Sequence, residues 1–558
     1  MLDILITNFV SKHKLTFFLY IVLILVFFPI QGLVLPNVYG KLYDSMKTNT
    51  KIGELTDIIN NIKKQNFAGL IVILLILWLI IIMSYSAKGI VETLIFPEYT
   101  SYLRTIVYEK LIETHKSNYT DIKTGDYLTR IMEFTKTCSS IFQYIITRFL
   151  PETVIVLFII VYMTYKNKNM GLVLLLSLIL CIIIQYIGGK YLVDLIAEKE
   201  THFNTVIGEN VQDSLDNLMN IYINNETTNE INKNKKNEND STEKTQKILN
   251  IQQLIVFATE VVCLVSYGVC LIMLYYLLKE QKISTSHSIV LILILGQYLN
   301  YFMGVNSGFL YYILSKIGIL YASKDYLNEL LKSTDQNKKR DVITKGKVEF
   351  KNVAFKYNKE TPENLFENLN FVIDGGSNVA LVGCSGSGKT TIMKLIVGLY
   401  KPTVGTIYID GVDINEIDVE YLRKEVIYVN QRTNMFNETV LYNMRYGNEV
   451  SEEEVEVFLK KYGLDDIFND LPDGIRGKAG VHGGNLSGGM QKMVILVRGV
   501  LKKGRIIMLD EPIAGLDSKT VEKVKRMIKE EMKGRTLIII SHEEGIKEVM
   551  RALIVKKC

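Results

Sequence analysis

Residues Gly383–Thr391 read GCSGSGKTT and fit the pattern G-x-x-x-x-G-K-[ST] of a phosphate-binding loop. The apolar run Val379–Val382 directly before it predicts a strand, and Ile392–Leu399 after it predicts a helix. In this context the glycines let backbone N–H groups turn toward the β- and γ-phosphates of a nucleotide. Lys389 adds a positive charge beside the phosphates, and the Thr390 hydroxyl is placed to ligate Mg²⁺.

The composition of the 558 residues separates a membrane-like part from a soluble part. Hydrophobic residues make up 48% of the chain, and the excess lies in the N-terminal part. The 64 basic and 59 acidic residues nearly balance, which argues against a nucleic-acid partner. The six cysteines show no C-x-x-C spacing, so the sequence predicts neither a metal site nor a disulfide framework.

Six runs in the N-terminal part have the length and apolar character of membrane-spanning helices, which need about 20 such residues. An even number of spans places both termini on one side of the membrane, and the phosphate-binding domain must meet cytosolic nucleotide. We therefore expect an integral, multi-pass membrane protein with both termini in the cytoplasm, although the loop lysines favour neither side. The predicted spans are about 15–36, 67–87, 145–165, 170–189, 254–278 and 289–315.

The predicted inner segments, Lys88–Tyr144 and Lys190–Gln253, are much longer than the outer loops. Apolar residues recur at helical spacing between Leu103 and Ile112, so we expect these segments to extend the spans as helices into the cytoplasm. Asn224–Thr245 is almost entirely polar and predicts a solvated turn between two long helices.

Several charged and amide side chains fall inside the predicted spans, where exposure to lipid is costly. Arg148 and Glu152 are four residues apart and could pair on a helix, whereas Glu260 has no local partner. Such groups either line a translocation cavity or form hydrogen bonds between helices, and the sequence leaves both interpretations open. The amides are Gln185, Gln297, Asn300 and Asn306.

A polar linker, 333–341, separates a transmembrane domain, 1–332, from a soluble domain, 342–558. The soluble domain begins with a strand pattern at Val348–Tyr357, and the Tyr357 ring could stack on an adenine base. Several motifs in this domain stand at strand ends or helix starts. In chain order they are Gln431, Leu486-Ser487-Gly488-Gly489, Asp510-Glu511, Ala514-Gly515-Leu516-Asp517 and Ser541-His542.

This set of motifs resembles the nucleotide-binding domain of ATP-binding cassette (ABC) proteins. The L-S-G-G signature between the phosphate loop and Asp510-Glu511 is far more specific than either alone. Thr124–Ile131, TGDYLTRI, also resembles the family pattern K-T-G-[ED]-x-x-x-R-[IL]. The whole chain looks like an ABC half-transporter of the exporter type. That implies an all-α six-helix transmembrane domain with long cytoplasmic helix extensions, followed by an α/β P-loop ATPase domain.

The resemblance implies a division of catalytic labour. Glu511 would act as the general base toward the attacking water, and His542 would contact the γ-phosphate. The remaining implied catalytic residues are Lys389 and Gln431. The implied Mg²⁺ ligands are Thr390, Gln431 and Asp510. The implied ATP-contacting residues are Tyr357, Gly383, Cys384, Ser385, Gly386, Ser387, Gly388, Lys389, Thr390, Thr391, Gln431, Ser487, Gly488, Gly489 and Asp517.

In the family, the signature of one subunit contacts the γ-phosphate bound by the other, so the resemblance implies two chains closing on two ATP molecules. The complete hydrolytic set favours a homodimer over a heterodimer. The implied function is ATP-driven export or flipping of a hydrophobic or amphipathic substrate by alternating access, in contact with membrane lipids. An ATP-gated regulator or channel, and an importer built on the exporter fold, are the alternatives, and the substrate is unknown.

Three positions depart from the family pattern. Met490 replaces the usual glutamine after L-S-G-G, and Asn430 stands where a proline often precedes Gln431. Val481 occupies a position where exporters often carry a glutamate. None of these changes removes a group with an implied catalytic role.

Overall fold

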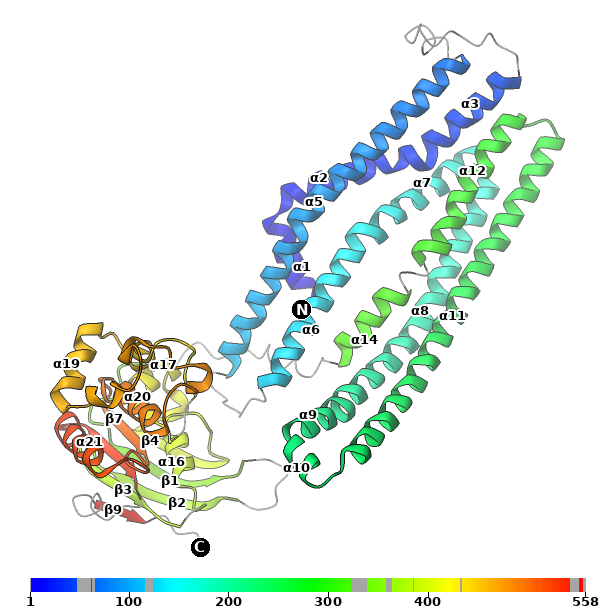
Figure 1. The fold of residues 1–558 in the computed structure, drawn as a ribbon. Coiled ribbons are helices and arrows are strands. Elements are labelled where there is room, and N and C mark those ends of the chain that lie inside the picture. The colour runs from blue at the N-terminus through cyan, green and yellow to red at the C-terminus, as the bar shows by residue number, and fades with distance from the viewer. Residues whose placement is uncertain are drawn as a thin grey trace. The chain divides into compact units, whose positions relative to one another are not determined.

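The computed structural model describes residues 2–47, 62, 66–115, 124–306, 308, 310–322, 339–357, 364–384, 386–431, 434–541 and 551–554. The chain divides into two compact units, Met1–Lys110 with Ile122–Leu331 and Leu111–Asp121 with Lys332–Cys558. Where described, the first unit is helical and the second combines helices with two β-sheets (Figure 1). The predicted order of an all-α domain followed by an α/β domain is therefore confirmed.

Six helices in the described part of the first unit are long and apolar enough to cross a membrane, which confirms the predicted number. Most extend well beyond the apolar runs, as the sequence predicted for the inner segments. The last one is shorter, because it ends before the C-terminal part of the run 289–315. The six cover Lys14–Lys47, Phe67–Thr114, Ile131–Lys166, Lys168–Thr201, Thr227–Lys279 and Thr285–Gly304.

These spans are built from α-helices with short π-helical segments between them. The α-helices of this unit are α1 (Leu2–Lys12), α2 (Lys14–Pro29), α3 (Leu35–Lys47), α5 (Phe67–His115), α6 (Thr124–Tyr144), α7 (Leu150–Lys166), α8 (Lys168–His202), α9 (Glu209–Asp216), α10 (Leu218–Ile223), α11 (Thr227–Lys279), α12 (Thr285–Tyr301) and α14 (Ser315–Ala322). The π-helical segments are η1 (Ile30–Val34), η2 (Ile145–Phe149), η3 (Phe203–Gly208), η4 (Phe302–Asn306) and η5 (Leu310–Leu314).

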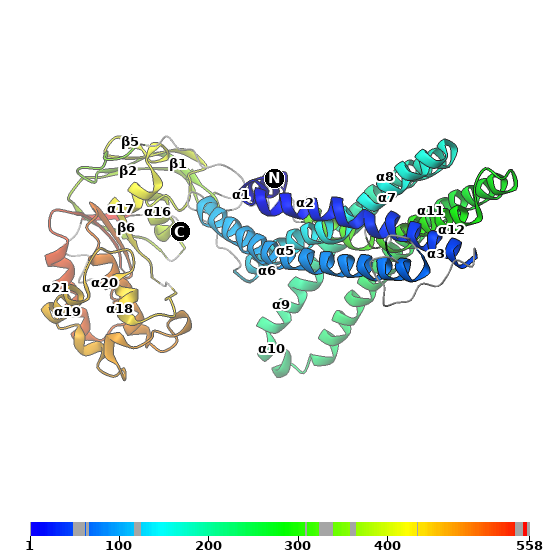
Figure 2. The ribbon, with the colours of Figure 1, turned by 90° about the horizontal axis from the view of Figure 1, so that it is seen from above.

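The long helices α8 and α11 pack side by side and are connected through η3, α9 and α10 (Figures 1 and 2). The polar stretch Asn224–Thr245, predicted as a turn, is instead helical from Thr227 onward and forms the start of α11. Its Asn, Lys and Glu side chains are mostly exposed, while the backbone groups are satisfied within the helix. The turn is confined to residues 224–226, where Asn225 adopts a φ of 55°.

The π-helical segment η2 has a local cause in Pro151. The N–H of Leu150 donates to the Ile145 carbonyl, five residues back, rather than to the Ile146 carbonyl. Pro151 has no N–H to give to the Ile146 or Thr147 carbonyl. Two carbonyls of η2 thus lose helical donors, and side chains from other helices must satisfy them.

The described residues of the second unit form nine strands in two sheets. An antiparallel sheet has the order β2-β1-β4-β5, and a parallel sheet has the order β6-β7-β8-β3-β9. The predicted strand before the phosphate loop is β3, and the predicted helix after it is α16. The strands are β1 (Val348–Phe355), β2 (Phe366–Ile373), β3 (Asn378–Val382), β4 (Val404–Ile409), β5 (Val412–Asp413), β6 (Val426–Val429), β7 (Ile506–Asp510), β8 (Thr536–Ile540) and β9 (Arg551–Ile554).

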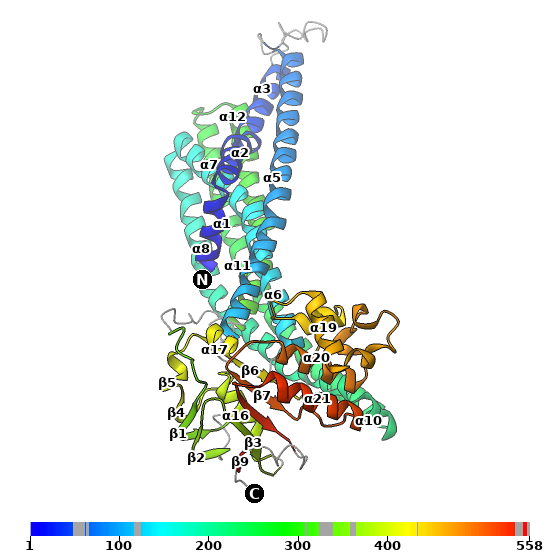
Figure 3. The same cartoon turned by 90° about the vertical axis from the view of Figure 1, so that its left-hand side faces the viewer.

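Helices cover the parallel sheet, and Figure 3 shows α19, α20 and α21 gathered on one side of it. The helices of this unit are α16 (Lys389–Ile396), α17 (Val419–Glu425), α18 (Val440–Arg445), α19 (Glu452–Tyr462), α20 (Gly488–Val500) and α21 (Ser518–Glu531). Short 3-10 turns are η6 (Ile414–Glu416), η7 (Asp465–Phe468), η8 (Gly474–Arg476) and η9 (Val481–Gly483).

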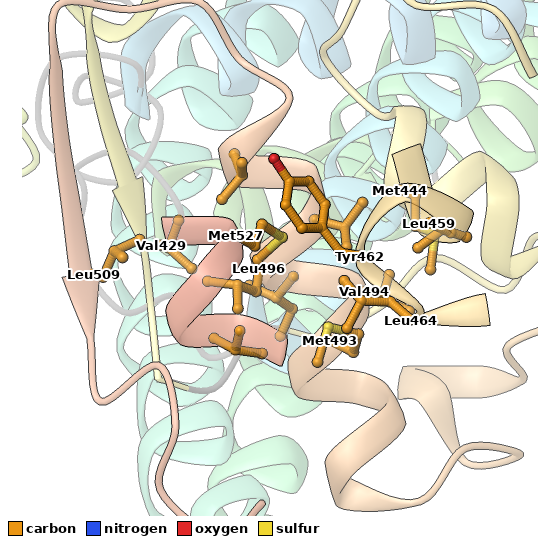
Figure 4. Packing of buried hydrophobic residues seen from close by; sticks show 14 of the residues in the cluster. Val429, Met444, Leu459, Tyr462, Leu464, Met493, Val494, Leu496, Leu509 and Met527 are labelled. Carbon is orange, nitrogen blue, oxygen red and sulfur yellow. The ribbon is translucent and has the colours of Figure 1, made fainter. Parts of the chain in front are cut away.

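Every residue of β7 is buried, because both faces of the parallel sheet are covered. Its side chains alternate between two apolar clusters. Ile507 and Leu509 pack with α18–α21 on one face (Figure 4), and Ile506 and Met508 pack with α16 and the antiparallel sheet on the other. This two-sided packing fixes β7 in the centre of the unit and sets the position of the Asp510 carboxylate at its end.

Candidate functional site

The motif residues that the structure describes gather at the C-terminal ends of the parallel strands. The phosphate loop follows β3, Gln431 follows β6, and Asp510 ends β7. Parallel strands end at the same edge of a sheet, and β6, β7, β8 and β3 are hydrogen-bonded neighbours in that order. The sheet topology therefore brings together residues that lie far apart in the sequence. Ser385 and His542 lie outside the described residues.

The phosphate loop is shaped for a group of negative charge. Lys389 Nζ donates to the carbonyls of Gly383 and Cys384, both at 2.8 Å, which holds the ammonium over the loop. Gly388 has a φ of 88°, and a Cβ there would lie 2.3 Å from the Phe366 ring. Only glycine satisfies both constraints. The Ser387 hydroxyl is buried and has no hydrogen-bond partner among the described residues.

A buried hydroxyl without a partner is costly, and a phosphate oxygen would satisfy it. The left-handed glycines, the Lys389 ammonium and the N-terminus of α16 complete a cradle that fits a triphosphate. Four cysteines in the described part of the chain, Cys138, Cys181, Cys263 and Cys270, are free thiols.

Thr390 and Asp510, two of the predicted Mg²⁺ ligands, are in direct contact. Thr390 Oγ1 donates to Asp510 Oδ2 at 2.8 Å, and Tyr428 Oη donates to the same oxygen at 3.3 Å. Burial raises the pKa of Asp510, while these hydrogen bonds and the nearby Lys389 charge oppose the rise. A hydroxyl and a carboxylate at this separation are oxygen donors of the kind Mg²⁺ prefers.

Glu511 is held in an unusual backbone conformation directly after β7. Its φ is 51°, which is uncommon for a residue with a side chain, and its N–H donates to the Ile540 carbonyl at 2.9 Å. Gln431 Nε2 donates to Glu511 Oε2. The structure thus joins Gln431 to the predicted general base. The Gln431–Glu511 contact and the Thr390–Asp510 contact therefore both lie at the C-terminal ends of the parallel strands.

Two further residues at this site carry no role in the sequence argument. Tyr428 lies in β6, and burial beside Asp510 raises the pKa of its hydroxyl. Lys492, in α20, donates through Nζ to the carbonyls of Glu511 and Ala514. Burial lowers the pKa of Lys492 against the attraction of Glu511 and Asp510. The position of Lys492 within the signature motif was the available signal, whereas only the sheet register identifies Tyr428.

The signature residues stand at the N-terminus of α20. Ser487 is the N-cap, and its hydroxyl accepts from the Met490 N–H at 3.3 Å. A Cβ added at Gly488 would meet nothing within 4 Å, so the helix end is open to a ligand. Within the described residues, no hydrogen bond joins Ser487, Gly488 or Gly489 to the phosphate loop of the same chain.

The positions that depart from the family pattern have structural explanations. The Met490 side chain is buried in the apolar cluster of α18–α21, which suits a thioether. Asn430 Oδ1 accepts from the Gln431 N–H at 2.9 Å and lies 3.1 Å from Tyr428 Oη, whose one hydrogen it shares with Asp510, so Asn430 orders the chain at the end of β6. Val481 is exposed and contributes little to the core.

Two further residues that the sequence predicted to contact ATP, Tyr357 and Asp517, lie in the described part of this unit. The Tyr357 ring is exposed, stands edge-on to Phe355 and Tyr400, and its hydroxyl hydrogen-bonds to Thr391 Oγ1. Asp517 is the N-cap of α21 and accepts from the N–H groups of Lys519 and Thr520, both at 3.0 Å. A hydrogen bond with the Thr520 side chain, followed by these backbone hydrogen bonds, lowers the pKa of Asp517.

The chain belongs to the ABC transporter family. The model of the ABC transporter transmembrane region matches residues 17–302, which is more than half of the chain, and the ABC transporter model matches residues 366–514. The protein therefore binds ATP and is an ATP hydrolase coupled to transport. The transmembrane match and the six apolar helices make it an integral, multi-pass membrane protein.

Individual relatives agree with this assignment. A Rickettsia bellii protein provisionally named export ATP-binding/permease protein is 26% identical over 479 residues, covering 85% of this chain and 81% of the relative. An ATP-dependent lipid A-core flippase of Legionella pneumophila (strain Paris) is 36% identical over 214 residues, covering 38% of this chain and 36% of the relative.

Among solved structures, a bacterial Atm1-family ABC exporter with ATP bound has the same fold. Its TM-score is 0.82 at 21% identity, covering 97% of this chain and 93% of that one. The chain thus has the fold of an exporter-type half-transporter, with one transmembrane domain and one ATP-binding domain. A half-transporter fold implies assembly into a dimer.

Proposed function

We propose that this protein exports or flips a hydrophobic or amphipathic substrate by alternating access. ATP binding and hydrolysis would power the cycle at the interface between two ATP-binding domains. One observation carries the proposal. The hydrolytic groups that the structure describes are in contact at the C-terminal ends of the parallel strands, with Thr390 on Asp510 and Gln431 on Glu511.

Each group has a role suited to phosphoryl transfer, which mainly needs positioning and charge stabilisation. Lys389 and the loop N–H groups would hold the phosphates. Thr390 and Asp510 would hold Mg²⁺ with Gln431, and the bound metal would neutralise charge on the phosphates. Glu511 accepts the proton of the attacking water, and the Gln431 amide fixes its carboxylate. His542 and Ser385 belong to the same proposed site by sequence.

The open signature end supports a second copy of the chain as the partner. Ser487, Gly488 and Gly489 present N–H groups at a helix N-terminus, but among the described residues they form no hydrogen bond with the phosphate loop of their own chain. A second chain would supply that loop, and the reciprocal contact would complete two sites. The intact Glu511 in this chain favours a homodimer over a heterodimer.

We further propose that both termini and the ATP-binding domain are cytoplasmic, because ATP is supplied there. The proposed domains are 1–332, a linker at 333–341, and 342–558. Membrane lipids would surround the spans, whose outward residues such as Leu75, Leu79 and Ile82 are apolar and exposed. An ATP-gated channel or an importer would use the same ATP site, so transport itself must be measured.

The test is ATP hydrolysis and substrate movement by the purified chain alone, in nanodiscs and in liposomes. Glu511→Gln should lower hydrolysis about 10²–10⁴-fold while ATP still binds, because only the general base is lost. Glu449→Gln, an exposed carboxylate, serves as the matched control and should hydrolyse ATP at the parent rate.

Hydrolysis by the chain alone would establish a self-sufficient homodimer. No hydrolysis by the parent chain would contradict the homodimer. Hydrolysis without ATP-dependent movement of a fluorescent lipid or drug-like amphiphile in either direction would favour the regulator or channel.

A further inference from the structure

A polar cavity lies inside the transmembrane unit. It has a volume of about 530 Å³, within the usual range for small-molecule sites. Its walls come from η1, α5, α6, η2, α7, α12 and η4, so several helices converge on it. Charged and amide side chains line it, among them Gln31, Arg148, Glu152, Gln297 and Asn300.

Arg148 and Glu152 both line this cavity, where they occupy one face of η2 and α7. Arg148 is exposed and Glu152 is half-buried. The charges of Arg148 and Lys88 attract Glu152, but no direct hydrogen bond or ion pair of Arg148 or Glu152 is formed with another described residue. Charged groups within a membrane domain are costly unless a partner or water satisfies them. Because the attraction acts without direct contact, both side chains can still form hydrogen bonds with a ligand.

The contrast with a nearby pair makes this arrangement informative. Lys88 pairs with Glu92 at 3.2 Å, and both side chains are largely buried. Lys88 Nζ also donates to the Thr147 carbonyl at 2.8 Å, and Tyr20 Oη donates to the Ile146 carbonyl at 2.9 Å. These are the two η2 carbonyls that Pro151 leaves without helical donors. The side chains of Tyr20 and Lys88 thus hold the backbone of η2 in place, while the Arg148 guanidinium lines the cavity.

The rest of the cavity suits a small polar group with an apolar attachment. Tyr85 Oη donates to Gln31 Oε1 at 3.0 Å, which orients one amide at the wall. A second, mainly apolar cavity of about 790 Å³ shares Tyr301 with the first. It is lined by Phe149 and Leu157, on the other face of η2 and α7. Polar and apolar spaces therefore adjoin at Tyr301.

We infer that the polar cavity binds a zwitterionic headgroup, with its anionic oxygens on Arg148 and its ammonium group on Glu152. A zwitterion can form a charge-assisted hydrogen bond with each of the two side chains, whereas an anion or a cation alone can do so with only one of them. The inference rests on the proposed function and narrows its amphipathic substrate to one that carries both charges. The headgroup could belong to a lipid or to a soluble molecule of the same chemistry.

Binding is measured without nucleotide, with the full chain in uncharged maltoside micelles. The probes are lyso-phosphatidylethanolamine, dodecyl phosphate and dodecylamine, which are zwitterionic, anionic and cationic amphiphiles. The parent should bind the zwitterion about tenfold or more tightly than either singly charged probe, because each charge adds a charge-assisted contact. Soluble O-phosphoethanolamine, added as a competitor, distinguishes a lipid ligand from a soluble one. If it displaces lyso-phosphatidylethanolamine, the headgroup alone is sufficient for binding. If it does not, binding also requires the acyl chain and the ligand is a lipid.

Arg148→Gln should weaken the zwitterion and the anionic probe but leave the cationic probe unchanged. Glu152→Gln should weaken the zwitterion and the cationic probe only. Glu260→Gln is the control, since Glu260 lies in a span but outside this cavity. Arg148→Lys keeps the charge if Arg148→Gln does not fold, and it should retain the preference for the zwitterion with reduced affinity.

Equal affinity of the parent for all three probes would overturn the inference. So would an equal loss in Glu260→Gln. Because no nucleotide is present, these outcomes do not depend on ATP hydrolysis or transport, and failure of the proposed function would leave them unchanged.

Discussion

The ATP-binding unit and the transmembrane unit both bury charged groups, but they satisfy them in different ways. In the ATP-binding unit the polar groups follow strands of one sheet, and each belongs to a short motif, as Thr390 and Asp510 do. In the transmembrane unit, Glu92 of α5 accepts from Lys88 of the same helix, and Lys88 and Tyr20 of α2 reach the Thr147 and Ile146 carbonyls of η2. Local sequence patterns therefore predict most of the network in the ATP-binding unit. The network in the transmembrane unit depends on helix packing and on a proline that frees backbone carbonyls.

The largest expected effect tests the network of the transmembrane unit. Lys88→Met keeps an unbranched side chain of nearly the same length but leaves Glu92 buried without its cation and the Thr147 carbonyl without the Lys88 donor. Breaking a buried pair in this way should cost about 3–5 kcal/mol of unfolding free energy. Unfolding by titration with sodium dodecyl sulfate can be followed through Trp78, the one tryptophan of the chain.

Two comparisons sharpen this test. Lys190→Met removes an exposed lysine of α8 and should change the unfolding free energy little. Lys88→Met combined with Glu92→Leu should be less destabilised than Lys88→Met alone, because no charge is then left unpaired. A double variant as unstable as the sum of its single changes would show that the two side chains act independently.

A smaller effect is expected in the ATP-binding unit, at a carboxylate outside the motifs. Asp410 accepts from four consecutive backbone N–H groups, those of residues 344–347, at 2.7–3.0 Å. Partial burial raises its pKa, but these hydrogen bonds outweigh burial and lower it. Asp410→Asn retains a residue tolerated at its φ of 50° but loses the charge. We expect a loss of about 1–2 kcal/mol at neutral pH, moderated by exposure to water.

The stabilisation by Asp410 should depend on pH, because it requires the ionised carboxylate. A carboxyl with a lowered folded-state pKa stabilises the fold above its unfolded pKa of about 3.9, and the contribution is lost as the pH falls through the folded value. Urea unfolding at neutral pH and near pH 3 should therefore show the difference between parent and Asp410→Asn shrinking in acid. Asp470→Asn, at an exposed site, is the control. A constant difference across this pH range would contradict the assignment.

The smallest expected effect concerns the nucleotide contact of Tyr357. If its exposed ring stacks on adenine, Tyr357→Ala should weaken ATP binding about tenfold. Tyr357→Phe should bind ATP almost as the parent does, because it loses only the hydrogen bond to Thr391. Binding of a fluorescent ATP analogue measures both. Equal losses in the two variants would assign the effect to the hydroxyl and not to the ring.

Local sequence patterns predicted most of the ATP-binding unit. β3, β7 and β8 were found as apolar runs because a parallel sheet covered on both faces selects continuous hydrophobic segments. The predicted turn at Asn224–Thr245 was wrong because composition alone was used. An exposed helix satisfies its own backbone and accepts polar side chains, so polarity does not distinguish it from a loop.

The sequence by itself determined the membrane-spanning helices, the phosphate loop and the order of the catalytic motifs, because each depends on residues close together in the chain. Tertiary structure alone decided that Tyr428 and Lys492 contact the Asp510-Glu511 turn. It also decided that Arg148 and Glu152 line a cavity without direct contact, while Lys88 and Glu92 form an ion pair. The physical reason is that the cost of a buried charge depends on which distant groups reach it, and sequence spacing does not specify those groups.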